Sequence, residues 1–150
     1  MATRSNIAYK TPEGKIRSIY CHWDGYPEHN GEMLVRYYQE ARKIAQLIEL
    51  GSLSSLNKEI HYKGEHNFNN PQEDVCVFYA RDRGEELHVS EYDDIPSWID
   101  DMEEYAYLWN GQEWLVNDHG ARDAHGFPIF DFVDVAQRKD VMSNMGWDKV

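Results

Sequence analysis

Residues 19–31, IYCHWDGYPEHNG, hold the side chains in this sequence that most resemble a reactive or metal-binding site. A cysteine, two histidines, an aspartate and three aromatic residues fall within thirteen positions. Cys21 and His22 do not form a catalytic dyad, because neighbouring residues of a strand point to opposite faces. The pattern therefore indicates chiefly a structural joint. A strand ends at Trp23, DGYP turns the chain, and Asn30 caps the following helix.

The same stretch also predicts a small-ligand site, which we keep as the alternative function. Basic residues are concentrated in the N-terminal hairpin, and a basic region can hold a phosphate or a nucleotide. The candidate ligand-binding residues are Arg4, His22, Trp23, Asp24 and Tyr26. This alternative is a nucleotide-type binding protein or enzyme that uses residues 22–31 and the basic hairpin.

Metal and catalytic motifs are otherwise weak. The seven histidines are scattered, without HExxH and without the His/Cys spacing of a zinc site. Asp118, His119, Asp123 and His125 could pair a carboxylate with an imidazole for acid–base work, but the flanking glycines favour a flexible loop. No glycine-rich phosphate loop is present. We therefore predict no catalytic residue, no metal and no cofactor.

Acidic residues are the least ordinary feature of the chain. The formal net charge is −12, and ten of the 27 acidic residues lie within residues 82–104. Such a surface repels nucleic acids and anionic membranes, and it suits a protein partner with a basic surface. The predicted partner-binding residues are Glu91, Asp93, Asp94, Trp98, Asp100, Asp101, Glu103 and Glu104. The alternative is a solvated face whose aromatic residues point inward.

The elements that must position these residues follow from the hydrophobic pattern. We expect hairpins over residues 6–23, 75–92 and 104–117, a helix over 31–50 and a short helix near 95–104. In the long helix, apolar residues recur at three- and four-residue steps: Leu34, Tyr37, Tyr38, Ala41, Ile44, Ala45 and Ile48. Residues 57–73 should form a surface excursion, and a further short helix is expected near 131–145. The prediction is one α+β domain over residues 1–150, an antiparallel sheet of hairpins with the long helix packed on one face.

The two cysteines, Cys21 and Cys76, lie in apolar strand-like runs and should be buried free thiols. No signal peptide is visible, and no apolar run approaches the ~20 residues of a membrane span. We therefore expect a cytoplasmic protein.

Residues 1–56 resemble a family of small proteins of tailed bacteriophages and prophages. The similarity rests on ATRSNI near the N-terminus, SIYCHWDGYP after a short hairpin, and LIELGSLSSL after the helix. The resemblance implies a phage origin and no particular activity, and the protein would then act in the host bacterial cytoplasm. The predicted function is a phage accessory protein that binds and inhibits a host protein, such as a defence or nucleic-acid-binding component, through its acidic surface. A homo-oligomer that packs through exposed aromatic residues is a further alternative.

Overall fold

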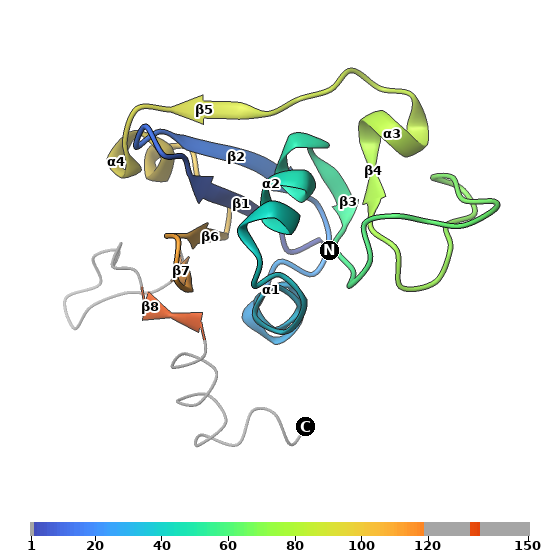
Figure 1. Cartoon of the computed structure of the whole chain (residues 1–150), viewed down its shortest axis with the longest axis horizontal. Coiled ribbons are helices and arrows are strands. Elements are labelled where there is room, and N and C mark those ends of the chain that lie inside the picture. Colours follow the sequence, from blue (N-terminus) through green and yellow to red (C-terminus); the bar gives the residue numbers. More distant parts are fainter. Residues whose placement is uncertain (1, 119–132, 136–150) are drawn as a thin grey trace.

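The computed structural model describes residues 2–118 and 133–135. In this part of the chain, eight strands form one mixed sheet with short helices on both faces (Figure 1). The strands are β1 (Ser5–Lys10), β2 (Ile16–Cys21), β3 (Leu53–Ser55), β4 (Val77–Phe78), β5 (Ser90–Tyr92), β6 (Tyr105–Trp109), β7 (Trp114–Asp118) and β8 (Val133–Asp134). The helices are the π-helical turn η1 (Pro27–Gly31), α1 (Glu32–Tyr37), α2 (Ala41–Glu49), α3 (Tyr79–Arg83) and α4 (Ile95–Asp100). The α+β class is confirmed, whereas the helix predicted near 131–145 lies largely outside the described residues.

The strand order is β4-β3-β2-β1-β6-β7-β8, and β5 pairs with the free part of β2. The β1–β2 and β6–β7 hairpins are confirmed. The expectation of a purely antiparallel sheet is wrong, because β1 pairs in parallel with β6, from Ser5 beside Tyr105 to Tyr9 beside Trp109. The β2–β3 pair is also parallel. Residues 100 positions apart in the chain therefore share the centre of the sheet.

The hairpin predicted over residues 75–92 is wrong as well. After Phe78 the chain enters α3, because the Asp82 carboxylate accepts the Phe78 backbone N–H at 2.8 Å. Gly84, with φ of 78°, ends that helix in the left-handed conformation common after helices. β4 then pairs with β3, and β5 pairs with β2.

Each face of the sheet carries its own core. The first is covered by α1 and α2 and is built around Ile7, Ile19, Tyr107, Leu34, Ile44 and Ile48. The second lies beneath α4 and is built around Ala8, Ile16, Leu108, Met102 and Trp98. β2 contributes to both cores, through Ile19 on one face and Ile16 on the other, and helices cover both faces rather than the one face predicted.

The long helix predicted over 31–50 is broken at Tyr38, whose backbone leaves the helical region. The break lets Tyr38 turn into the core, where its hydroxyl donates to the Asn57 carbonyl at 2.6 Å. The Tyr38 carbonyl accepts the Trp114 indole N–H at 2.7 Å. The Lys43 ammonium donates to the Tyr37 carbonyl, which lies at the end of α1 and has no N–H donor within the helix. Tertiary hydrogen bonds thus override a local pattern that favours one continuous helix.

Candidate functional site

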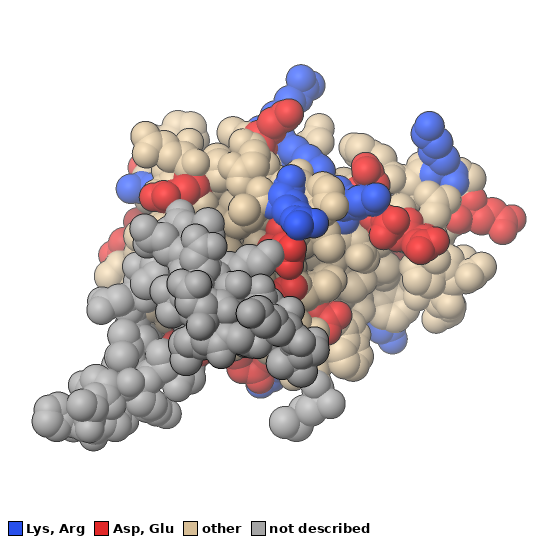
Figure 2. Space-filling model, turned by 90° about the horizontal axis from the view of Figure 1, so that it is seen from below, with Lys and Arg blue, Asp and Glu red and all other residues tan. Residues whose placement is uncertain are grey.

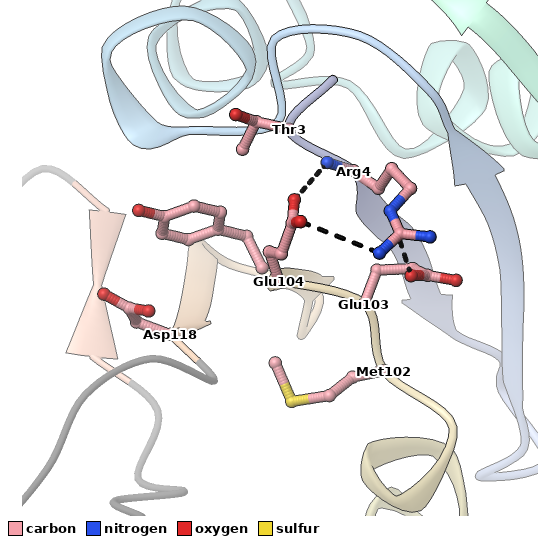
Figure 3. Close-up of a pocket in the computed structure, with 7 residues that line it drawn as sticks. Thr3, Arg4, Met102, Glu103, Glu104 and Asp118 are labelled. Carbon is pink, nitrogen blue, oxygen red and sulfur yellow. Dashed lines mark hydrogen bonds and ion pairs between the residues drawn. The ribbon is translucent and has the colours of Figure 1, made fainter. Parts of the chain in front are cut away.

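An acidic recess of about 480 Å³ lies where β1 and β6 begin and β7 ends (Figure 3). It exists because β1 and β6 are parallel neighbours, so both strands begin at the same end of the sheet, next to the last residue of β7. The lining residues are Thr3, Arg4, Met102, Glu103, Glu104, Tyr105 and Asp118. Three carboxylates and one guanidinium line this recess, so its chemistry favours a cationic group.

Arg4 is held in the recess by weak interactions. Its guanidinium lies 3.6 Å from a Glu103 carboxylate oxygen and 3.7 Å from a Glu104 carboxylate oxygen. Its backbone N–H also donates to Glu104. All three side chains are between about one third and one half exposed, and exposed ion pairs stabilise a protein by only ~0–1 kcal/mol. The cation of another molecule can therefore replace Arg4 at low cost.

Most of the other predicted partner-binding carboxylates follow β5 and α4. Glu91 lies 2.7 Å from the Arg17 guanidinium, and Asp93 contacts the Lys15 ammonium. The Asp94 side chain caps α4 by accepting a backbone N–H of its first turn, which lowers the pKa of this carboxyl. On the face drawn in Figure 2, basic and acidic side chains similarly lie side by side. The carboxylates near β5 and α4 thus have basic side chains beside them that partly neutralise their charge.

The predicted partner-binding residues of α4 differ in exposure. Asp100 is exposed, and Asp101 accepts the Tyr92 hydroxyl at 2.9 Å. Trp98 is 1% exposed, and its indole N–H donates to the Ser18 hydroxyl at 2.8 Å. Trp98 therefore belongs to the core beneath α4, and its side chain does not reach the surface on which a partner would lie.

The alternative ligand-binding residues do not converge on one pocket. Arg4 lines the acidic recess, whereas Trp23 is 45% exposed and contacts the His22 ring edge-on at 4.7 Å. Asp24 adopts a positive φ of 57° and accepts the Tyr26 hydroxyl at 2.9 Å, which raises the pKa of Tyr26. These contacts make the segment the strand–turn–helix joint that the sequence predicts.

Asn30 is the centre of that joint rather than a helix cap. Its side chain is fully buried inside η1, and its amide donates to the Ser5 hydroxyl, to the Cys21 sulfur and to the Trp23 carbonyl. Burial raises the pKa of Cys21 to about 12, although the Asn30 hydrogen bond lowers it. Cys21 is therefore a protonated, buried thiol, and Cys76 is likewise buried and free.

Gly25 lets the N-terminal strand pass close to this joint. A Cβ atom there would lie 2.8 Å from the Ser5 Cβ atom and 2.9 Å from backbone atoms of Thr3 and Arg4. The Gly25 N–H donates to the Thr3 carbonyl, and its carbonyl accepts the Tyr107 hydroxyl. The joint thus supports the wall of the acidic recess.

A buried ionic cluster was not expected from the sequence. His66, from the excursion over 57–73, lies 3.1 Å from the Asp82 carboxylate, and both side chains are almost completely buried. Burial alone would raise the pKa of Asp82, but hydrogen bonds from Arg81, from the Phe78 backbone and from His66 lower it. Arg81 also donates to the Ile60 carbonyl at 2.6 Å. The cluster fastens the excursion to α3.

No sequence motif indicates this cluster. His66 and Asp82 are sixteen positions apart, and Asp82 begins the run of acidic residues over 82–104, where solvated carboxylates are the ordinary expectation. The described residues hold no group of three or more His, Cys, Asp or Glu side chains placed to bind a metal ion. The acid–base candidates His119, Asp123 and His125 lie outside the described residues.

Comparison with protein-family models, with curated protein sequences and with solved structures gives no match. In the part of the chain that the structure describes, no helix is both long enough and apolar enough to cross a membrane.

Proposed function

We propose that this protein is a phage accessory protein that binds and inhibits a basic host protein in the bacterial cytoplasm. The contact surface is the acidic stripe, which we define as Glu91, Asp93, Asp94, Asp100, Asp101, Glu103 and Glu104. The observation that carries the proposal is a net charge of −12 whose carboxylates along this stripe are held only by exposed contacts.

The ion pairs within this stripe are exposed, so a partner can replace them with ion pairs of its own. The Asp93 side chain is 83% exposed although Lys15 contacts it, and the Glu91 side chain is 46% exposed beside Arg17. Such pairs contribute little to folding because water screens them. A partner that offers lysine or arginine side chains replaces one exposed pair by another and adds long-range attraction to a net negative protein.

The acidic recess adds a cavity that a single basic side chain of the partner can enter. Its volume of about 480 Å³ accommodates a lysine or arginine side chain, and Met102 supplies apolar surface for the side chain's methylene groups. Glu103 and Glu104 then bind the incoming cation in place of Arg4. The same charge disfavours direct contact with nucleic acid or an anionic membrane.

Affinity capture from a bacterial lysate tests the proposal. We would compare the tagged wild-type protein with the triple variant Asp93→Lys/Asp100→Lys/Asp101→Lys. Asp94 is left unchanged because it caps α4. We expect the variant to retain at least about tenfold less partner, because rim charges govern association and salt sensitivity. Wild-type capture should weaken as ionic strength rises.

A charge-matched control separates the stripe from net charge. Glu13, Glu65 and Glu73 are exposed and lie outside the stripe, so Glu13→Lys/Glu65→Lys/Glu73→Lys changes the net charge by the same amount. This control should retain the partner. Equal retention by the stripe variant, or an equal loss in the control, contradicts binding by the acidic stripe.

A further inference from the structure

A second recess, of about 490 Å³, lies at the opposite end of the β1–β6 pair from the acidic recess. After β1 the chain turns back into β2 on one side, and after β6 it turns back into β7 on the other. Because the two turns diverge from adjacent parallel strands, they leave a crevice at the strands' carboxyl ends, where ligands bind in many parallel sheets. The first turn of α2 closes this crevice, which we call the basic recess.

Two cations in the basic recess are left without acidic partners. Lys10 and Arg42 both line it and are both exposed. Within residues 2–118 and 133–135, neither forms an ion pair, whereas Arg4, Lys15 and Arg17 all do. In a protein with a formal net charge of −12, two unneutralised cations at one hollow create a local positive potential.

The N-terminus of α2 adds to that potential. Glu40 is extended and its side chain makes no capping hydrogen bond. The first helical bond is donated by Ile44 to the Glu40 carbonyl at 3.0 Å, so the backbone N–H groups of Ala41 and Arg42 have no helical acceptor. Free N–H groups at the start of a nine-residue helix favour an anion.

Aromatic side chains form part of the wall of the basic recess. Trp109 lines the recess, and its side chain is only 6% exposed. The Tyr9 hydroxyl is engaged by Glu49, so Tyr9 presents its ring to the recess. Two aromatic residues and two cations thus line the same recess.

We propose that the basic recess binds a small aromatic anion, a flat molecule that bears a carboxylate or phosphate group. The anionic group lies between Lys10, Arg42 and the start of α2, and the ring packs against Tyr9 and Trp109. This site is at the far end of the sheet from the acidic recess and does not depend on a protein partner.

Titration of the full chain with three ring-matched probes tests the site. Phenyl phosphate and benzoate carry the two anionic groups, and benzamide is the neutral counterpart. The readout is the ¹H–¹⁵N signal of the Trp109 indole, assigned by the loss of one signal in Trp109→Phe. We expect at least one anionic probe to bind with a dissociation constant of about 1 mM or tighter, a value reasonable for a ligand of this size, and to shift the Trp109 signal. Benzamide should bind at least about tenfold more weakly.

Comparison of the two anions identifies the preferred group. Lys10→Gln/Arg42→Gln should lower affinity by about tenfold or more, as expected when charge-assisted hydrogen bonds are removed. Lys63→Gln/Arg36→Gln removes the same charge elsewhere and should bind as the wild type does. The proposal is overturned if neither anion binds, if benzamide binds equally well, if both double variants bind equally, or if the Trp109 signal stays unchanged when the probe is bound.

Discussion

The acidic and basic recesses lie at opposite ends of the same two parallel strands. They differ in whether their charged side chains are already paired. In the acidic recess, Arg4 already neutralises part of the charge of Glu103 and Glu104. In the basic recess, Lys10 and Arg42 have no acidic partner among the described residues. The first arrangement favours exchange of one cation for another, and the second favours addition of an anion. Similar volume therefore does not imply similar function.

The largest expected effect is a loss of stability at α4, which should loosen the acidic recess and leave the basic recess unchanged. Trp98→Ala removes the side chain that fixes α4 on the sheet, and a buried Trp-to-Ala change typically costs ~3–5 kcal/mol. The urea midpoint should fall strongly. Because Met102 and the following glutamates continue from α4, the acidic recess should loosen. The Trp109 indole signal should stay in place, because Trp109 packs in the core on the other face.

Ser18→Ala is the matched control for this change. It removes the acceptor of the Trp98 indole N–H and keeps the ring, so the expected loss is only ~1–2 kcal/mol. An equal loss in both variants would show that the hydrogen bond, rather than packing by the ring, holds α4. A shifted Trp109 signal in Trp98→Ala would show that the two ends are not independent.

Gly25→Ala should give the next largest effect, at the acidic end. The added Cβ atom would overlap Ser5 and the backbone of Thr3, and overpacking of this kind costs ~1–3 kcal/mol. Gly14→Ala is the control near the basic end, since φ is positive there but no atom lies within 4 Å. Its cost should be only the backbone strain, ~1 kcal/mol. Urea unfolding of both variants measures the difference, and an equal cost would contradict close packing at Gly25.

The sequence predicted well what depends on local periodicity. The first predicted hairpin is β1–β2, and the short helix expected near 95–104 is α4. The third predicted hairpin is confirmed as β6–β7. Only Gly111 has a positive φ in its turn, so the turn is not type I′, which needs two such residues.

The features that the sequence did not predict depend on distant contacts. Tyr38 breaks a helix that has the right period, because Trp114 and Asn57 offer it hydrogen bonds. The parallel β1–β6 pairing has no local signal, although it creates both recesses. The acidic charge was visible from composition, but its pairing with Arg4 and Arg17 was not.

Acid should weaken the basic end through Glu49. The hydrogen bond from Arg17 lowers the pKa of Glu49 below its usual 4.5, and Tyr9 adds a second hydrogen bond. A lowered folded-state pKa gives stability that is present above the unfolded pKa and is lost as pH falls through the folded value. Because the Glu49 side chain is 43% exposed, screening limits the loss to less than about 1 kcal/mol.

Glu49→Gln should therefore lower the free energy of unfolding at neutral pH by less than about 1 kcal/mol, and should flatten its fall below about pH 4.5, where the wild type loses the same contribution. Urea midpoints at pH 6 and pH 3 measure this slope. Glu65→Gln, whose side chain is exposed and lies outside any described ion pair, should keep the wild-type slope. A wild-type slope in Glu49→Gln would mean that the Arg17 pair does not stabilise this end.

The smallest effect on stability, and the most direct test of exchange, is expected for Arg4→Gln. Loss of its exposed pairs should change the free energy of unfolding by less than about 0.5 kcal/mol. The variant leaves Glu103 and Glu104 without their internal cation, so a short oligolysine peptide should bind more tightly than it binds the wild type at low salt. Calorimetric titration at two ionic strengths measures this. If Arg4→Gln binds the peptide no better than the wild type, Arg4 does not compete for the recess, and the two ends differ only in the sign of their charge.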